Sequence, residues 1–275
     1  MRLLRLRKPP PYVMGVSWPR SGHHLMARLL RLYYGPKFTY CGFYGQTGCC
    51  GQTPCARAGT VRYSKNHDFD GTLPQDTRHR YLIQTRAFAP SVVSNFELYL
   101  RDGGDDDAAS FARFASTQFT AWQAFQDKWV TSDFARSQTV IPYEALIHDP
   151  PTALTYALSS FGDPTPDPAR LRTAIGRVDG EEVADRRIRS RPASGIHAPR
   201  DVTQFRHYDA KLFTYLDKLA LTRQEVNRLF RRHLGRDAAE ANMLALQASP
   251  SLDALERMIL GSPEYAARGG VLRVV

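Results

Sequence analysis

Residues 19–24 read Pro-Arg-Ser-Gly-His-His and bring together residue types that suit a bound phosphate. Arg20 carries a fixed positive charge, Ser21 offers a hydroxyl, and Gly22 lets the backbone approach a ligand closely. The rings of His23 and His24 can each donate an N–H to a phosphate, with some dependence on pH. Because the sequence lacks the GxxxxGK[ST] string of ATP-binding loops, this loop is of a shorter kind. A strand-to-helix turn without a ligand is the structural alternative.

Two more groups of polar residues could act together with this loop. In the first, Lys65 and His67 are two residues apart. A histidine can act as a general base near neutral pH, and a lysine can neutralise charge on a transferred group. In the second, Arg86 and Ser94 provide a cation and a hydroxyl that could hold a second phosphate. Taken alone, each group also fits an ordinary surface or capping role.

Each of these polar groups follows a run that is predicted to be a buried strand. The runs at 12–17, 61–64 and 81–84 are short and apolar, whereas residues 21–34 and 90–100 have the pattern of helices. A strand, a tight turn and a helix form the unit that builds a parallel sheet. Because the carboxyl ends of parallel strands meet at one edge of the sheet, we expect the three polar groups to lie close together.

The remaining periodic segments extend the same pattern along the chain. They predict a helix at 111–130, a strand at 139–142, and helices at 151–161, 222–234, 238–247 and 252–260. The sequence therefore predicts an α/β fold with three P-loop-like layers, in which helices flank a central parallel sheet. Two domains are expected, one over residues 1–220 and a small helical appendage over residues 221–275.

The order of the motifs resembles the superfamily of sulfotransferases that use PAPS, 3′-phosphoadenosine 5′-phosphosulfate. The shared elements are the strand followed by the first loop, the Lys-Asn-His segment, and the Arg-x7-Ser pair. In that family the first loop binds the 5′-phosphosulfate, and residues matching Arg86 and Ser94 bind the 3′-phosphate. Tyr143, which opens a Tyr-Glu-Ala-Leu segment, would pack near the adenine. Arg189 and Arg191 stand in the place of a loop that closes on the 3′-phosphate.

This resemblance spans about residues 12–208 and implies a function. The chain would transfer the sulfuryl group of PAPS to a hydroxyl or amine of an unidentified acceptor, such as a carbohydrate, a lipid or a small alcohol, and release PAP. His67 would be the general base, Arg20 and Lys65 would stabilise the transferred group, and no metal would be required. Two features depart from the family pattern. The two histidines of the first loop stand where Thr or Ser is usual, and its cation is arginine where lysine is common.

The last part of the chain has a resemblance of its own. Residues 233–237, His-Leu-Gly-Arg-Asp, and residues 262–265, Ser-Pro-Glu-Tyr, are similar to a small helical bacterial domain of the DUF4214 type. The similar region runs from about residue 224 to residue 268. The resemblance implies an appendage for packing or association and says nothing about chemistry.

The charge of the chain narrows the choice of partners. The sequence has 37 Lys and Arg against 27 Asp and Glu, and its net charge of +10 favours a polyanion. No apolar run reaches the roughly 18–20 residues that cross a bilayer, and prolines at 9–11 follow the basic start. We therefore expect a cytoplasmic protein with at most peripheral membrane contact through that start. The alternatives are a P-loop kinase and a non-catalytic nucleic-acid-binding protein, although we expect no nucleic-acid partner.

All four cysteines fall in one short window: Cys41, Cys49, Cys50 and Cys55. Their even number suggests a local cross-link, but their spacing matches no standard zinc pattern. Disulfides, a zinc site and free thiols all remain open. The Gly- and Cys-rich segment 35–60 is expected to be irregular. Because it lies between two of the polar groups, we expect it to shape the acceptor pocket.

Overall fold

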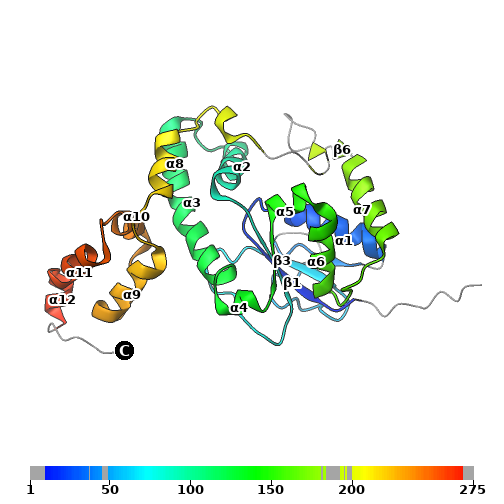
Figure 1. Cartoon of the computed structure of the whole chain (residues 1–275), viewed down its shortest axis with the longest axis horizontal. Helices are drawn as coiled ribbons and strands as arrows, with labels where there is room; N and C mark the ends of the chain where they lie inside the picture. Colours follow the sequence, from blue (N-terminus) through cyan, green and yellow to red (C-terminus); the bar gives the residue numbers. More distant parts are fainter. Residues whose placement is uncertain are drawn as a thin grey trace, which may run out of the picture. The chain divides into compact units, whose positions relative to one another are not determined.

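The computed structural model describes residues 10–36, 38–44, 49–180, 182–183, 193–194, 196 and 200–268. The chain divides into two compact units (Figure 1). Unit 1 comprises Met1–Asn95 and Lys128–Asp201, and unit 2 comprises Phe96–Asp127 and Val202–Val275. The long helices α2, Phe88–Arg101, and α3, Ala108–Trp129, contribute residues to both units.

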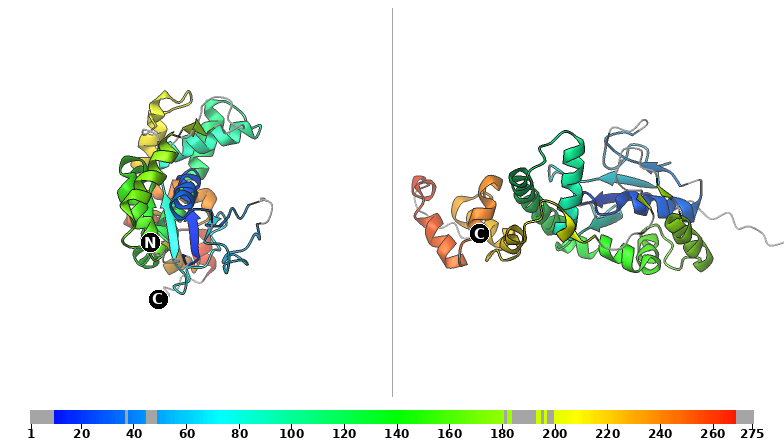
Figure 2. Two further views of the ribbon diagram at one scale, coloured as in Figure 1. Left: turned by 90° about the vertical axis from the view of Figure 1, so that its right-hand side faces the viewer. Right: turned by 90° about the horizontal axis from the view of Figure 1, so that it is seen from above.

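Unit 1 is built on a five-stranded parallel sheet with the order β2-β3-β1-β4-β5. The strands are β1 Val13–Ser17, β2 Tyr40–Cys41, β3 Tyr63–Asn66, β4 Tyr81–Thr85 and β5 Thr139–Pro142. Every residue of β1 and β4 is buried, as expected for parallel strands that are covered on both faces. Figure 2 shows the strands side by side. The prediction of an α/β fold with a central parallel sheet flanked by helices is confirmed.

Helices pack together over one face of this sheet. They are α1 His23–Tyr34, α5 Tyr143–His148, α6 Pro150–Ser160 and α7 Pro168–Gly180. Their apolar side chains form one cluster with side chains of the strands, which includes Met26, Leu30, Leu154, Phe161 and Val178. The helix α7 was not predicted. The remaining elements of unit 1 are α4 Asp133–Arg136 and an antiparallel pair, β6 Glu182–Val183 with β7 Ala193–Ser194.

Two strands differ from their prediction near the candidate site. The strand β3 covers Tyr63–Asn66 and not 61–64, because its ladder with β1 pairs Gly15 with Lys65 and Val16 with Asn66. Lys65 is therefore inside the strand, and only His67 follows it. The strand β2 lies in the segment that was expected to be irregular. It is only two residues long, too short for a periodic signal.

Residues 221–265 of unit 2 form a hydrophobic core of their own. The helices of unit 2 that follow α3 are α8 Ala210–Asp217, α9 Arg223–Leu234, α10 Met243–Gln247, α11 Leu252–Leu260 and α12 Pro263–Ala267. The helix α9 begins with a capping box between Thr222 and Glu225 and ends at Gly235 in the left-handed conformation. The core includes Val226, Phe230, Met243, Leu246 and Leu255. The predicted boundary between residues 220 and 221 stays a prediction. No helix among the described residues is long and apolar enough to cross a bilayer.

Candidate functional site

The candidate site lies where the chain leaves the central strand β1. The chain runs from β1 to β2 and β3 on one side of β1 and then crosses from β3 to β4 on its other side, so the switch point of the sheet lies at the carboxyl end of β1. Ligands of α/β sheets bind at such points. The three predicted groups of polar residues follow or end β1, β3 and β4. The topology therefore brings together residues that are up to 74 positions apart in sequence, as in the pair Arg20 and Ser94.

The first loop is a tight turn held by its own hydrogen bonds. Arg20 and Gly22 both have a positive φ, 64° and 82°. The hydroxyl of Ser21 donates to the carbonyl of Trp18 at 2.6 Å, and this side chain is fully buried. Ser21 therefore stabilises the turn, and its predicted contact with a phosphate stays a prediction. A Cβ at Gly22 would lie 2.6 Å from the ring of Tyr143, so only glycine allows that ring to pack against the turn.

Two arginines, a serine and a tyrosine meet beside this turn. The Nε of Arg20 donates to the hydroxyl of Ser94 at 2.9 Å. The Nη1 of Arg86 donates to the carbonyl of Arg20 at 3.0 Å, and its guanidinium lies 4.3 Å from the centre of the Tyr143 ring. The structure thus brings the predicted phosphate-binding residues Arg86 and Ser94 to the first loop, with Tyr143 alongside.

His67 lies at the end of β3, and its ring is held in one orientation. Its Nδ1 is 2.6 Å from the carbonyl oxygen of Ser17 at the end of β1. Because a carbonyl can only accept, Nδ1 carries the hydrogen and Nε2 is left as the acceptor of the ring. The ring also stacks on Tyr44, with centroids 5.5 Å apart and an angle of 14° between planes. The Tyr44 hydroxyl accepts the backbone N–H of His67 at 2.8 Å.

Lys65 and His24 lie beside His67 and share its electrostatic environment. The Nζ of Lys65 is 3.4 Å from the Nε2 of His24. Burial, and then the charge of Lys65, lowers the pKa of His67 to about 3 and that of His24 to about 4. Both rings are therefore neutral near pH 7, which is the form of an imidazole that can accept a proton.

Positive charges converge on the same region. Burial lowers the pKa of Lys65, and the nearby charge of Arg20 lowers it further. Burial also lowers the pKa of Arg86; Tyr143 and Glu144 partly offset this lowering, and the charges of Arg20 and Arg200 add to it. Burial is the larger cause of both shifts, and repulsion between cations at short range adds to it. A bound polyanion would relieve this repulsion, so the site has the electrostatic character of an anion-binding site.

His23 has a different place from the one predicted. Its ring is 4% exposed and stacks on Tyr63, with centroids 4.9 Å apart. Its Nδ1 is 3.3 Å from the Tyr63 hydroxyl. Burial, the main cause, and the charge of Lys65 lower the pKa of His23 well below its usual value. The ring therefore packs in the core, and what His23 offers to a ligand is its backbone N–H in the first turn of α1.

Two aromatic residues near His67 were missed from the sequence. Tyr44 is 37% exposed and Phe69 is 71% exposed, and the Phe69 ring lies 5.1 Å from the His67 ring. Asp68 stands between His67 and Phe69 in the sequence. Its buried carboxylate accepts the indole N–H of Trp129 at 2.7 Å and pairs with Lys128 at 2.8 Å. The Asp68 contacts fix the turn that carries His67. The signal that the sequence offered for these aromatic residues was Phe69, a phenylalanine two residues after the candidate base.

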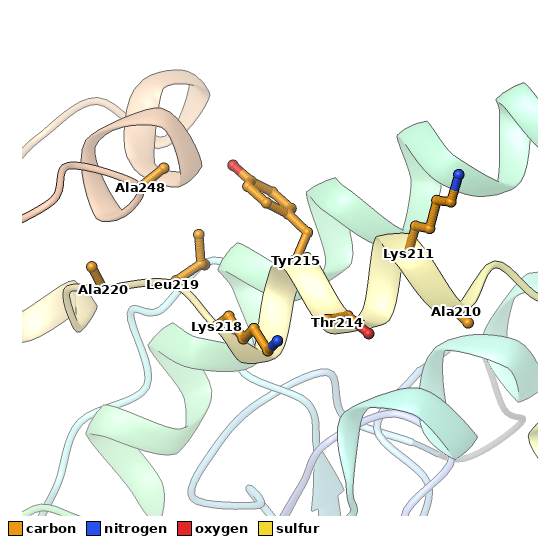
Figure 3. Close-up of a pocket in the computed structure, with 8 residues that line it drawn as sticks. All are labelled: Ala210, Lys211, Thr214, Tyr215, Lys218, Leu219, Ala220 and Ala248. Carbon is orange, nitrogen blue, oxygen red and sulfur yellow. The ribbon is translucent and has the colours of Figure 1, made fainter.

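Other features lie outside this site. Arg189 and Arg191 are outside the described residues. A hollow of about 550 Å³ lies in unit 2, and it contains none of the predicted site residues (Figure 3). It is lined by Ala210, Lys211, Thr214, Tyr215, Lys218, Leu219, Ala220 and Ala248.

Comparisons with known proteins give a distant likeness. No model of a protein family matches the chain, and no curated protein matches it. Among solved structures, the mouse sulfotransferase SULT7A1 complexed with PAP is similar over 74% of this chain and 78% of that chain. The two share 15% sequence identity, with a TM-score of 0.47. A likeness at this level does not assign a function.

Proposed function

We propose that the chain is a sulfotransferase that takes PAPS as its donor and a hydroxyl or amine as its acceptor. The observation that carries this proposal is the meeting of Arg20, Arg86, Ser94 and Lys65 with a neutral, oriented His67 at the carboxyl end of β1. Cations and a hydroxyl suit the two anionic ends of the donor. The neutral imidazole can accept a proton from the acceptor, and the negative charge of the bound donor would raise the pKa of His67 from about 3 toward the working pH.

Different residues would bind the two anionic ends of the donor. Arg86 and Ser94 would bind the 3′-phosphate, with the Tyr143 ring near the adenine. The backbone N–H groups at the start of α1, with Arg20 and His24, would bind the 5′-phosphosulfate. This division gives a reason for the short contact between Arg20 and Ser94, because the two phosphate-binding groups then share one wall of the site.

The transfer would be an in-line displacement at sulfur. The acceptor oxygen forms a bond to sulfur, the bond between sulfur and the bridging oxygen of the 5′-phosphate breaks, and PAP leaves with the electron pair. The Nε2 of His67 takes the proton from the acceptor hydroxyl. Lys65 and Arg20 neutralise the charge that develops on the sulfuryl group and on the leaving phosphate. Atoms, electrons and protons balance in this reaction without a metal or a redox partner.

The exposed rings of Tyr44 and Phe69 lie on the acceptor side of this arrangement. Both contact His67, and an aromatic ring offers a flat apolar surface on which a sugar ring or an apolar alcohol can lie. We therefore include them in the acceptor site. Neither residue belongs to the groups that would hold the donor.

Sulfuryl transfer can be tested by incubating the protein with labelled PAPS and a panel of hydroxyl and amine acceptors. PAP formation and label transfer are measured together. His67→Gln should reduce turnover by about 10²–10⁴-fold, because general-base catalysis is lost, while PAP affinity stays nearly unchanged. Retention of most of the activity would contradict the role of His67. Phosphoryl transfer from ATP that depends on Mg²⁺ would instead support the kinase alternative.

A further inference from the structure

Three of the four cysteines converge at the edge of the sheet. Cys41 ends β2, and Cys50 and Cys55 lie in the segment before β3. The three Sγ atoms all lie within 4.8 Å of one another, and those of Cys50 and Cys55 are 3.5 Å apart. Cys41 and Cys55 are almost fully buried, whereas Cys50 is half-buried. Thiols from two separate parts of the chain therefore face a common point.

The spacing of the sulfur atoms suits a tetrahedral metal ion. Zinc–sulfur bonds of about 2.3 Å in tetrahedral geometry place the sulfur atoms about 3.8 Å apart. A disulfide would use two of the three thiols and would not explain why the third lies beside them. Thiolate ligands favour zinc among the common divalent ions, because zinc accepts soft ligands and imposes no competing geometry.

The surroundings of the three thiols resemble the outer shell of a metal site. The backbone N–H of Ala56 donates to the Sγ of Cys50 at 3.4 Å, a contact that stabilises negative charge on sulfur. The backbone N–H of Cys55 donates to the Tyr12 hydroxyl at 2.9 Å, and that hydroxyl is 2.8 Å from the hydroxyl of Ser64 in β3. Val61 packs against the cluster from the apolar side. The ligands are thus held in place by groups that do not themselves bind the ion.

We propose that Cys41, Cys50 and Cys55 bind one Zn²⁺ as thiolates. Binding forms three zinc–sulfur bonds and releases three thiol protons to solvent. The fourth position would be taken by a water molecule, because the Sγ of Cys49, which packs against the same cluster, is not among the three that converge. The ion has no part in the transfer reaction.

The zinc site has a structural purpose that can be stated from the contacts of the segment. The strand β2 pairs with β3 through only two residues, Tyr40 and Cys41, so its edge position needs further support. The segment beyond β2 also carries Tyr44, which stacks on His67, and Thr53, which accepts the side-chain N–H of Asn66 at 3.0 Å. Zinc would therefore fasten the segment that forms the acceptor side. This consequence rests on the proposed function, whereas zinc binding itself does not.

The test is metal analysis of the full chain, purified under reducing conditions after expression with added zinc. We expect one zinc per chain, which is released by an organomercurial reagent. We also expect that substitution with Co²⁺ gives the intense absorption bands of tetrahedral thiolate coordination. The single variants Cys41→Ser, Cys50→Ser and Cys55→Ser should each lose at least 10-fold in zinc affinity, measured by competition with a chelator. Cys49→Ser is the matched control and should retain zinc.

Several results would overturn the proposal. They are a wild-type chain that neither contains zinc nor gives the cobalt bands, a disulfide between any two of the three cysteines under these conditions, and an iron–sulfur chromophore. Zinc retained at full affinity in all three variants would also overturn it, since the ligands would then lie elsewhere. Loss of folding in the variants does not obscure the answer, because zinc content and cobalt spectra of the wild type are measured independently. Zinc without any PAP binding would leave this proposal standing and contradict the proposed function.

Discussion

His67, the general base of the proposed function, has a ring that is already held in one orientation. Its ring is fixed by the carbonyl of Ser17 on one side and the ring of Tyr44 on the other. The sequence singles out His67 as a candidate base after a predicted strand, and that role stays a prediction. The sequence could not predict the tautomer, which depends on a carbonyl 50 positions away in the chain.

The titration of His67 predicts how stability depends on pH. Burial lowers its pKa from 6.5 to about 3, so between these values the unfolded chain binds a proton at His67 that the folded chain does not. The free energy of unfolding should therefore fall as the pH decreases below 6.5, by about 1.4 kcal/mol per pH unit for this group. Denaturant unfolding at pH 7.5 and pH 5.5 measures the change. The wild type should lose about 1 kcal/mol more than His67→Gln, and equal losses would contradict the neutral, buried state of His67.

The strand ends show what the sequence predicts well and what it does not. The elements β1, β4, β5, α9 and α11 lie within one or two residues of their predicted ranges. Their apolar periodicity was strong, and the convergence of the polar groups followed from parallel topology. The side chains of Ser21 and His23 were interpreted as phosphate donors, but both are buried. Their orientation depends on contacts with Gln84 and Tyr63 from other strands, which a local pattern does not contain.

The turn between β1 and α1 offers a prediction with an internal control. Gly22 and Gly35 have nearly the same φ, 82° and 83°, but only a Cβ at Gly22 would meet the Tyr143 ring, whereas Gly35 has open space. Gly35, with a ψ of −167°, lies in a region that only glycine adopts easily, so Gly35→Ala should cost about 1–3 kcal/mol of stability and leave PAP affinity unchanged, because only the backbone is strained. Gly22→Ala should cost at least as much and weaken PAP binding about 10-fold or more, because Tyr143 is displaced.

Thermal unfolding and PAP titration of both glycine variants give the comparison. Equal PAP affinities for Gly22→Ala and Gly35→Ala would show that the packing of Tyr143 against the turn is not part of the nucleotide site.

The whole chain carries a net charge of +10, but the candidate site does not depend on that total. What matters is that Arg20 is close enough to lower the pKa of Lys65, and that Arg20 and Arg200 are close enough to lower the pKa of Arg86. Sequence analysis predicted the meeting of Arg20, Lys65 and Arg86 from the order of strands. It did not place Arg200 at this site. Arg189 and Arg191, outside the described residues, stay predictions.

Calorimetric titration with PAP tests the account most directly, with AMP and ATP as controls and with and without Mg²⁺. We predict that PAP binds with a micromolar dissociation constant that does not depend on Mg²⁺. AMP should bind more weakly, because it lacks the 3′-phosphate. Arg86→Ala should weaken PAP binding by about 10–100-fold, because a charge-assisted contact with the 3′-phosphate is lost. Arg78→Ala removes the same charge at an exposed position and should leave it unchanged. Equal affinity for PAP and AMP, or binding of ATP only with Mg²⁺, would contradict the proposed function.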